Sequence, residues 1–184
     1  MKHSGPKIGK LDLTAMALAL ALGAAVAAPA MANGGGSGGS STPPTCAKGQ
    51  VYSSKTKGCV KAERGVLPDE QMTEYAYALA KEGRYTEALD VLDLLQNPNT
   101  ARALNYRGYA TRKLGRTEEG ISYYLRSVAL DPNYAQVREY LGEAYVVQGR
   151  FDLAKQQLTT IKSICGSDCE EYVDLADAIS SAML

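Results

Sequence analysis

The sequence has no tryptophan, one phenylalanine and a single histidine among its 184 residues. The histidine is His3, so the chain has no imidazole beyond its first few residues. Imidazole is the usual general base of enzymes and the commonest protein ligand for metals. Its absence argues against a hydrolase and against a zinc enzyme. Nothing else in the sequence predicts a catalytic residue, a cofactor or a metal site.

An excess of charge is also missing, because 20 basic residues balance 20 acidic ones. Without residues 1–32, whose removal is argued next, 17 basic and 19 acidic residues remain. This balance gives no long-range attraction to nucleic acid or to anionic lipid. The composition therefore favours a protein or peptide partner over a nucleic acid.

Residues 1–32 have the layout of a secretory signal peptide. A basic head precedes the apolar run "LTAMALALALGAAVAAPA", and "AMA" at 30–32 offers small residues to a signal peptidase. Cleavage is predicted between Ala32 and Asn33, and no membrane span should remain afterwards, because Gly and Ser follow instead of basic stop-transfer residues. We expect an exported protein, periplasmic or, as the alternative, fully secreted.

Two small segments precede the main domain. Residues 33–45, rich in Gly, Ser and Pro, are typical of a flexible linker. Residues 46–64 contain two short β-prone stretches around the polar turn "SSKTKG", which predicts a hairpin. Two strands alone are marginal in water, so a disulfide between Cys46 and Cys59 would make this unit viable.

Four cysteines permit three pairings. We favour Cys46–Cys59 and Cys165–Cys169, because the members of each pair are close in sequence and the pairs are far apart. A helix N-terminus at Cys169 would favour the thiolate, which leaves a thiol–disulfide redox role as an alternative. The C-x-x-x-C spacing and the lack of a βαβ pattern favour a structural disulfide instead.

A Gly-Arg pair returns three times, with its glycine at Gly83, Gly115 and Gly149, at spacings of 32 and 34 residues. A small residue lies seven positions before each glycine and another five positions after it. This pattern predicts a helix, a glycine turn and a second helix packed closely on the first. The last 20 residues predict one more helix, with Ser167 and Asp168 as its cap and an apolar stripe that includes Val173, Leu175, Ile179 and Met183.

The stretches "YLGEAYVVQGRFDLAKQQL" and "YRGYATRKLGRTEEGISYYLRSVALDPNY" resemble the tetratricopeptide repeat (TPR). The resemblance implies an all-α solenoid over residues 66–184. Its repeats would span about 69–99, 101–134 and 135–166, with a capping helix at about 168–183. Gly120 stands where Ala is usual in the family, and a glycine inside a helix costs about 1 kcal/mol, so we expect the middle repeat to be the weakest.

The resemblance further implies a concave groove that grips an extended peptide or a partner helix, and hence a non-enzymatic adaptor of the cell envelope. An oligomeric scaffold is the alternative that the sequence does not separate from it. The middle of the groove is basic in sequence, so we expect it to favour a carboxylate or an acidic segment, with two tyrosines as apolar anchors. A solvated helix face is the simpler explanation of the same charges. The predicted groove residues are Thr73, Tyr77, Lys81, Arg102, Asn105, Tyr109, Arg112, Lys113, Glu139 and Glu143.

Overall fold

A computed structural model describes residues 43–184, which contain seven helices and one two-stranded hairpin. The predicted signal peptide, its cleavage site at Ala32 and Asn33, and most of the predicted linker lie outside the described residues. Within residues 43–184, none of the helices has the length and apolar character that a membrane crossing requires.

The predicted hairpin is confirmed. Strand β1 (Gln50–Ser53) pairs antiparallel with β2 (Gly58–Lys61), and Val51 lies opposite Val60. Cys46 and Cys59 form the predicted disulfide, with their Cα atoms 5.8 Å apart.

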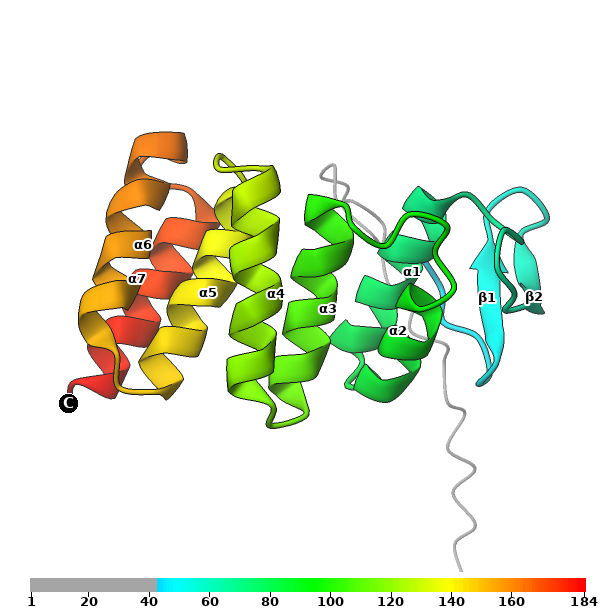
Figure 1. Cartoon of the computed structure of the whole chain (residues 1–184), viewed down its shortest axis with the longest axis horizontal. Helices are drawn as coiled ribbons and strands as arrows, with labels where there is room; N and C mark the ends of the chain where they lie inside the picture. Colours follow the sequence, from blue (N-terminus) through cyan, green and yellow to red (C-terminus); the bar gives the residue numbers. More distant parts are fainter. Residues whose placement is uncertain (1–42) are drawn as a thin grey trace, which may run out of the picture. The chain divides into compact units, whose positions relative to one another are not determined.

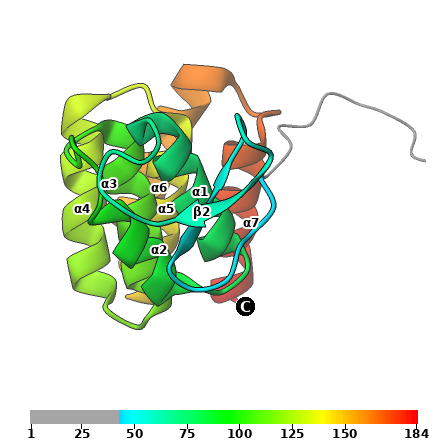
Figure 2. The same ribbon diagram turned by 90° about the vertical axis from the view of Figure 1, so that its right-hand side faces the viewer.

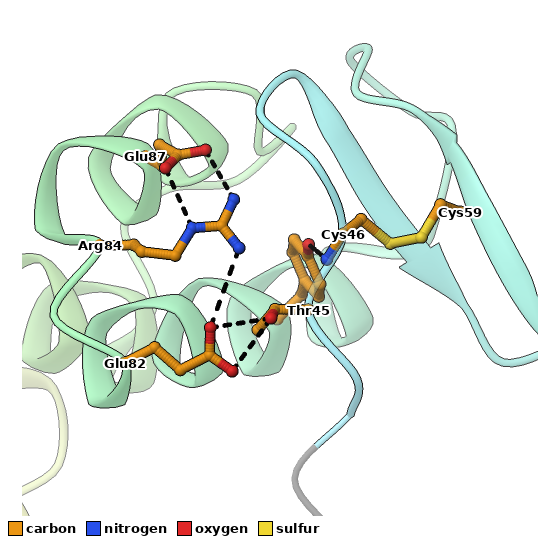
Figure 3. Close-up of a disulfide and its surroundings, with 7 residues drawn as sticks. Thr45, Cys46, Cys59, Glu82, Arg84 and Glu87 are labelled. Carbon is orange, nitrogen blue, oxygen red and sulfur yellow. Dashed lines mark hydrogen bonds and ion pairs between the residues drawn. A yellow bond between two sulfur atoms is a disulfide. The ribbon is translucent and has the colours of Figure 1, made fainter.

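The hairpin packs on the first helix, α1 (Asp69–Lys81), as Figures 1 and 2 show. Val51 is fully buried in this contact. The backbone N–H of Cys46 donates a hydrogen bond to the hydroxyl oxygen of Tyr75, 2.7 Å away. The Thr45 hydroxyl lies 2.8 and 2.9 Å from the two carboxylate oxygens of Glu82, just beyond the end of α1 (Figure 3). The hairpin therefore shares its core with the helices instead of standing alone.

The helices follow one another as three antiparallel pairs and a final single helix (Figure 1). The first helix of each pair contacts the first helix of the next pair, and the second helices cover the other side. The predicted all-α solenoid of three repeats and a capping helix is confirmed. The remaining elements are α2 (Tyr85–Leu92), α3 (Ala101–Lys113), α4 (Thr117–Leu130), α5 (Ala135–Val147), α6 (Phe151–Cys165) and α7 (Glu170–Ala182).

Each recurring glycine ends the first helix of a pair in the left-handed region, with φ of 79° at Gly83, 85° at Gly115 and 69° at Gly149. In all three turns the N–H of the following arginine donates to the carbonyl five residues earlier; Arg84 to Leu79 is 2.9 Å. This is the bonding pattern of a Schellman helix end, and it turns the chain back antiparallel. Glycine adopts this conformation without the steric cost of a side chain.

The arginine of each pair is the N-cap residue of the second helix. Arg84 donates from two of its nitrogens to Glu87, three residues on, as Figure 3 shows. These bonds hold the pKa of Glu87 below its ordinary value. Arg116 makes a single contact of this kind, from one of its nitrogens to Glu119 at 3.2 Å. The third repeat has Leu153 at the acidic position, and there Arg150 lies over the ring of Tyr145, 4.7 Å from its centroid. In the first two repeats the arginine thus holds a glutamate in the first turn of the second helix, where a negative charge is favourable.

The small residues allow a very close approach within the middle pair. A Cβ added to Gly120 would lie 2.9 Å from the carbonyl oxygen of Gly108, and one added to Gly108 would lie 2.6 Å from the ring of Tyr124. Gly120 is therefore required by contact with α3, and the expectation that it only weakens the repeat is revised. In the third repeat, Gly142 has Leu175 of α7 as its nearest neighbour.

The capping helix differs from its predicted form in two respects. Its N-cap residue is Cys169, and neither Ser167 nor Asp168 caps its backbone. Only part of the predicted apolar stripe is buried: Leu175 and Ile179 pack inward, whereas Val173 and Met183 are exposed. The helix covers α5 with one narrow face because its other side has no further repeat to contact.

The Gly120→Ala substitution tests the backbone contact. Helix propensity alone predicts a gain of about 1 kcal/mol, whereas a methyl group forced against a backbone carbonyl costs about 1–3 kcal/mol. We expect a net loss, measured as a lower free energy of unfolding in urea. Ser122→Ala, an exposed change in the same helix, serves as the control and should be neutral or slightly stabilising. A variant that gains stability like this control would contradict the close contact.

Candidate functional site

The helices α1, α3, α5 and α7 together line a pocket of about 270 Å³. Six of the ten predicted groove residues lie on its wall, and four do not. The lining residues are Tyr77, Lys81, Tyr109, Lys113, Gln136, Glu139, Tyr140, Glu143, Glu170, Glu171 and Asp174.

Three of the four other predicted residues serve the structure itself. Thr73 is buried, and its hydroxyl donates to the carbonyl of Asp69 at 2.7 Å. Asn105 is completely buried and donates from its amide nitrogen to Tyr134 and Gln136. Arg112, also buried, is described next. The fourth, Arg102, is half-exposed and pairs with Glu74 at 2.8 Å. Helical spacing places all four on the expected face, but it does not reveal which of them neighbouring helices cover.

Arg112 was predicted to attract a partner's carboxylate, and the structure contradicts this. Its side chain is only 7% exposed. One guanidinium nitrogen lies 2.5 Å from the carboxylate of Glu143 on α5, and another donates to the hydroxyl of Tyr124 at 3.3 Å. The charge of Arg112 is therefore neutralised inside the protein, and the ion pair with Glu143 joins the second repeat to the third.

The predicted apolar anchors, Tyr77 and Tyr109, belong to a cluster of packed aromatic rings. Tyr77 stacks on Tyr106 with ring centroids 4.3 Å apart, and Tyr109 lies against Tyr140 at 5.0 Å. The hydroxyl groups of Tyr77 and Tyr140, from the first and third repeats, are 3.0 Å apart. Burial raises the pKa of Tyr109 and that of Tyr140. Tyr109 is buried and Tyr77 is half-buried, so little of either ring is left for a partner, contrary to the expected apolar anchors. We call Tyr77, Tyr106, Tyr109, Tyr124 and Tyr140 the tyrosine cluster.

Sequence reasoning missed the contribution of α7 to the pocket. Glu170 and Glu171 are absent from the predicted groove residues, yet both lie on the pocket wall together with Asp174. One signal could have found them, because Glu170 follows the wall residue Gln136 by 34 residues, the length of one repeat. The capping helix therefore occupies the place of the first helix of a fourth repeat.

The charges on the wall are divided unevenly. Lys81 and Lys113 lie over the rings of Tyr77 and Tyr109, with their Nζ atoms 5.8 and 5.4 Å from the centroids. The α5 and α7 part carries carboxylates only. We call Glu139, Glu143, Glu170, Glu171 and Asp174 the acidic subsite.

Glu139 is the most unusual member of the acidic subsite. Its residue is only 7% exposed, and among residues 43–184 its carboxyl group has no hydrogen bond and no ion pair. Burial raises its pKa to about 8, and the negative charges of Glu143, Asp174, Glu171 and Glu170 add to the rise. At neutral pH the free protein therefore holds a proton on most copies of Glu139.

Two comparisons with known proteins bear on the family. Residues 94–135 and 112–159 match the family model described as tetratricopeptide repeat. The first TPR domain of the human RPAP3 protein, solved by NMR, matches with a TM-score of 0.54 and 21% identity over 62% of this chain and 91% of that chain. The family model thus supports tetratricopeptide repeats over residues 94–159, and the structural match shows a shared fold.

A second TPR-like neighbour in structure is the crystal structure of MamA, with a TM-score of 0.50 and 18% identity over 62% of this chain and 76% of that chain. Identities this low show that the fold is shared, and they carry no information about a shared ligand. No curated protein sequence matches the chain.

The cysteines near α7 offer no open site. Cys165 and Cys169 are bonded to each other, and no cysteine within residues 43–184 is free. Their sulfur atoms and a carboxylate oxygen of Glu171 lie within 4.8 Å of one another. A metal would need the sulfurs as thiolates, which the disulfide prevents. The redox alternative remains a hypothesis, and the bond as it stands ties the end of α6 to the start of α7.

The raised pKa of Glu139 predicts a pH-dependent stability. Between the ordinary pKa of 4.5 and the folded value of about 8, the folded state holds a proton that the unfolded chain releases. Stability from this residue is therefore full below pH 4.5 and declines as the pH rises to 8. We expect Glu139→Gln to match the wild type at pH 4 and to be about 4 kcal/mol more stable at pH 8, because a change of one in pKa corresponds to about 1.4 kcal/mol.

Urea unfolding at both pH values measures this difference. Asp177→Asn, an exposed change within α7, is the control and should follow the wild-type curve at both. An equal effect of Glu139→Gln at pH 4 and pH 8 would contradict the assignment.

Proposed function

We propose that this chain is a non-enzymatic adaptor that binds an extended peptide or a partner helix in its concave groove. The TPR-type fold supports this, because stacked helix pairs create an extended concave surface that such proteins use for binding. The single observation that carries the proposal is the pocket on that surface, to which four helices from all three repeats and the cap contribute.

The polar character of the pocket supports binding over catalysis. It presents two lysines, several carboxylates and parts of three tyrosines, and such charges can be matched by complementary charges of another protein. No imidazole and no free thiol lies among the described residues. Export to the cell envelope belongs to the same proposal, and its support is the sequence of residues 1–32.

Capture of a partner from an envelope extract, with the full chain as bait, tests the proposal. The groove variant replaces four exposed wall residues by alanine: Lys81, Lys113, Glu170 and Asp174. The matched control replaces two lysines and two aspartates outside the pocket, also exposed: Asp90, Asp152, Lys155 and Lys162. Both variants remove the same charges and leave the core intact, so both should fold.

We expect wild type and control to capture the same cross-linked protein, and the groove variant to lose at least about tenfold of it, since several contacts worth about 1 kcal/mol each are removed. Tyr109 and Arg112 are unsuitable for this test, because both are buried and their substitution would destabilise the fold. Equal capture by the groove variant and the control would move binding away from the pocket.

A further inference from the structure

The acidic subsite differs from the rest of the groove in having too few cations of its own. Arg112 neutralises Glu143. No ion pair to Glu139, Glu170, Glu171 or Asp174 forms within residues 43–184. Exposed carboxylates are common and by themselves indicate nothing. The four here, however, surround the same pocket from two helices, and one of them is buried.

Glu139 is the decisive member, because a buried carboxyl group without a partner is costly. The equivalent residues of the first and second repeats, Thr73 and Asn105, are also buried, and both donate hydrogen bonds inside the protein, although the side-chain oxygen of Asn105 accepts none. Glu139 has no such bond and lies on the pocket wall instead. Its carboxyl oxygens are not among the fully buried, unpartnered side-chain atoms of residues 43–184, so they are open to the pocket, and a charged partner can reach them only from there.

The walls beside Glu139 determine what kind of cation fits. Tyr77, Tyr109 and Tyr140 line the same pocket, and the apolar parts of such rings can cover the methylene groups of a lysine or arginine side chain. A hard metal ion needs oxygen ligands on most sides, and within residues 43–184 no three carboxylates of this pocket bring their oxygen atoms close enough together to hold one. The combination of carboxylates with aromatic walls matches the end of a lysine or arginine side chain.

We propose that the acidic subsite receives a lysine or arginine side chain from a basic segment of the partner protein. This inference rests on the proposed function and reverses the charge expected from the sequence, which was an acidic partner. The cation would sit between Glu139 of α5 and the carboxylates of α7. Lys81 and Lys113, at the other end of the pocket, would turn away additional basic residues and so set the direction of the segment.

A proton is coupled to this binding. Glu139 holds a proton at neutral pH in the free protein, because burial and four neighbouring carboxylates raise its pKa to about 8. A cation next to the carboxyl group lowers that pKa and releases the proton to the buffer. The bound state then contains a paired, ionised Glu139.

The binding experiment uses the full chain and a labelled, acetylated peptide in which lysines alternate with glycine and serine. Fluorescence anisotropy at low ionic strength gives the dissociation constant. Glu139→Gln with Asp174→Asn is the test variant, and Asp90→Asn with Asp152→Asn is the control that removes two exposed charges elsewhere. We expect the test variant to weaken binding about tenfold, the effect of one charge-assisted hydrogen bond, and the control less than about twofold.

Proton release gives a second readout that a general charge effect would not produce. Calorimetry of the wild type at pH 7 in phosphate and in Tris should show different apparent enthalpies, because the two buffers take up the released proton with different heats. The single variant Glu139→Gln should show the same apparent binding enthalpy in both buffers, because its amide has no proton to release.

Three results would overturn the inference: no binding of the lysine peptide, equal weakening by test and control variants, or tighter binding of the same peptide with glutamates in place of lysines. Calcium chloride at millimolar concentration, if it bound at Glu139 while the lysine peptide did not, would also overturn it. None of these outcomes affects partner capture through the pocket, so the proposed function can survive the failure of this inference.

Discussion

The contact between Gly108 and Gly120 positions much of the groove. Because neither residue has a Cβ, α3 and α4 approach closely, and the ring of Tyr124 lies over Gly108. The hydroxyl of Tyr124 then accepts a hydrogen bond from Arg112, which pairs with Glu143 of the next repeat. The close packing of α3 against α4 thus helps to position the ion pair that joins the second repeat to the third. Such contacts between neighbouring units are what stabilise a stacked array.

The groove owes its character to how its charges are satisfied. Arg112 forms an ion pair with Glu143, and the tyrosine cluster fills the space between the first and third repeats. What remains open to a partner is the pocket edge, with lysines at one end and unpaired carboxylates at the other. The electrostatic preference of the site therefore follows from pairing inside the protein. Counting the charges of the predicted groove residues in the sequence, without knowledge of this pairing, instead predicts an acidic partner.

Both ends of the helical array are covered by a unit that contains a disulfide. The hairpin closed by Cys46–Cys59 packs on α1, and the Cys165–Cys169 bond links α6 to the capping helix. Terminal repeats need such covers because their outer apolar faces have no neighbour. Arg64, just after the hairpin, adds to the first cover by donating to the carbonyls of Asp93 and Leu95 beyond α2.

The sequence by itself determined the helix pairs, their turns and the hairpin, because these depend on local properties: a glycine at positive φ, a spacing near 34 residues, and cysteines close together. It also placed six of ten groove residues on the pocket wall. Only the tertiary structure decided which groove residues are buried. Tyr77 and Tyr140 are 63 residues apart in sequence, yet their hydroxyl groups are in contact, and Glu139 lies within reach of the charges of the α7 carboxylates. Both arrangements arise from the stacking of whole repeats, which no local sequence pattern encodes.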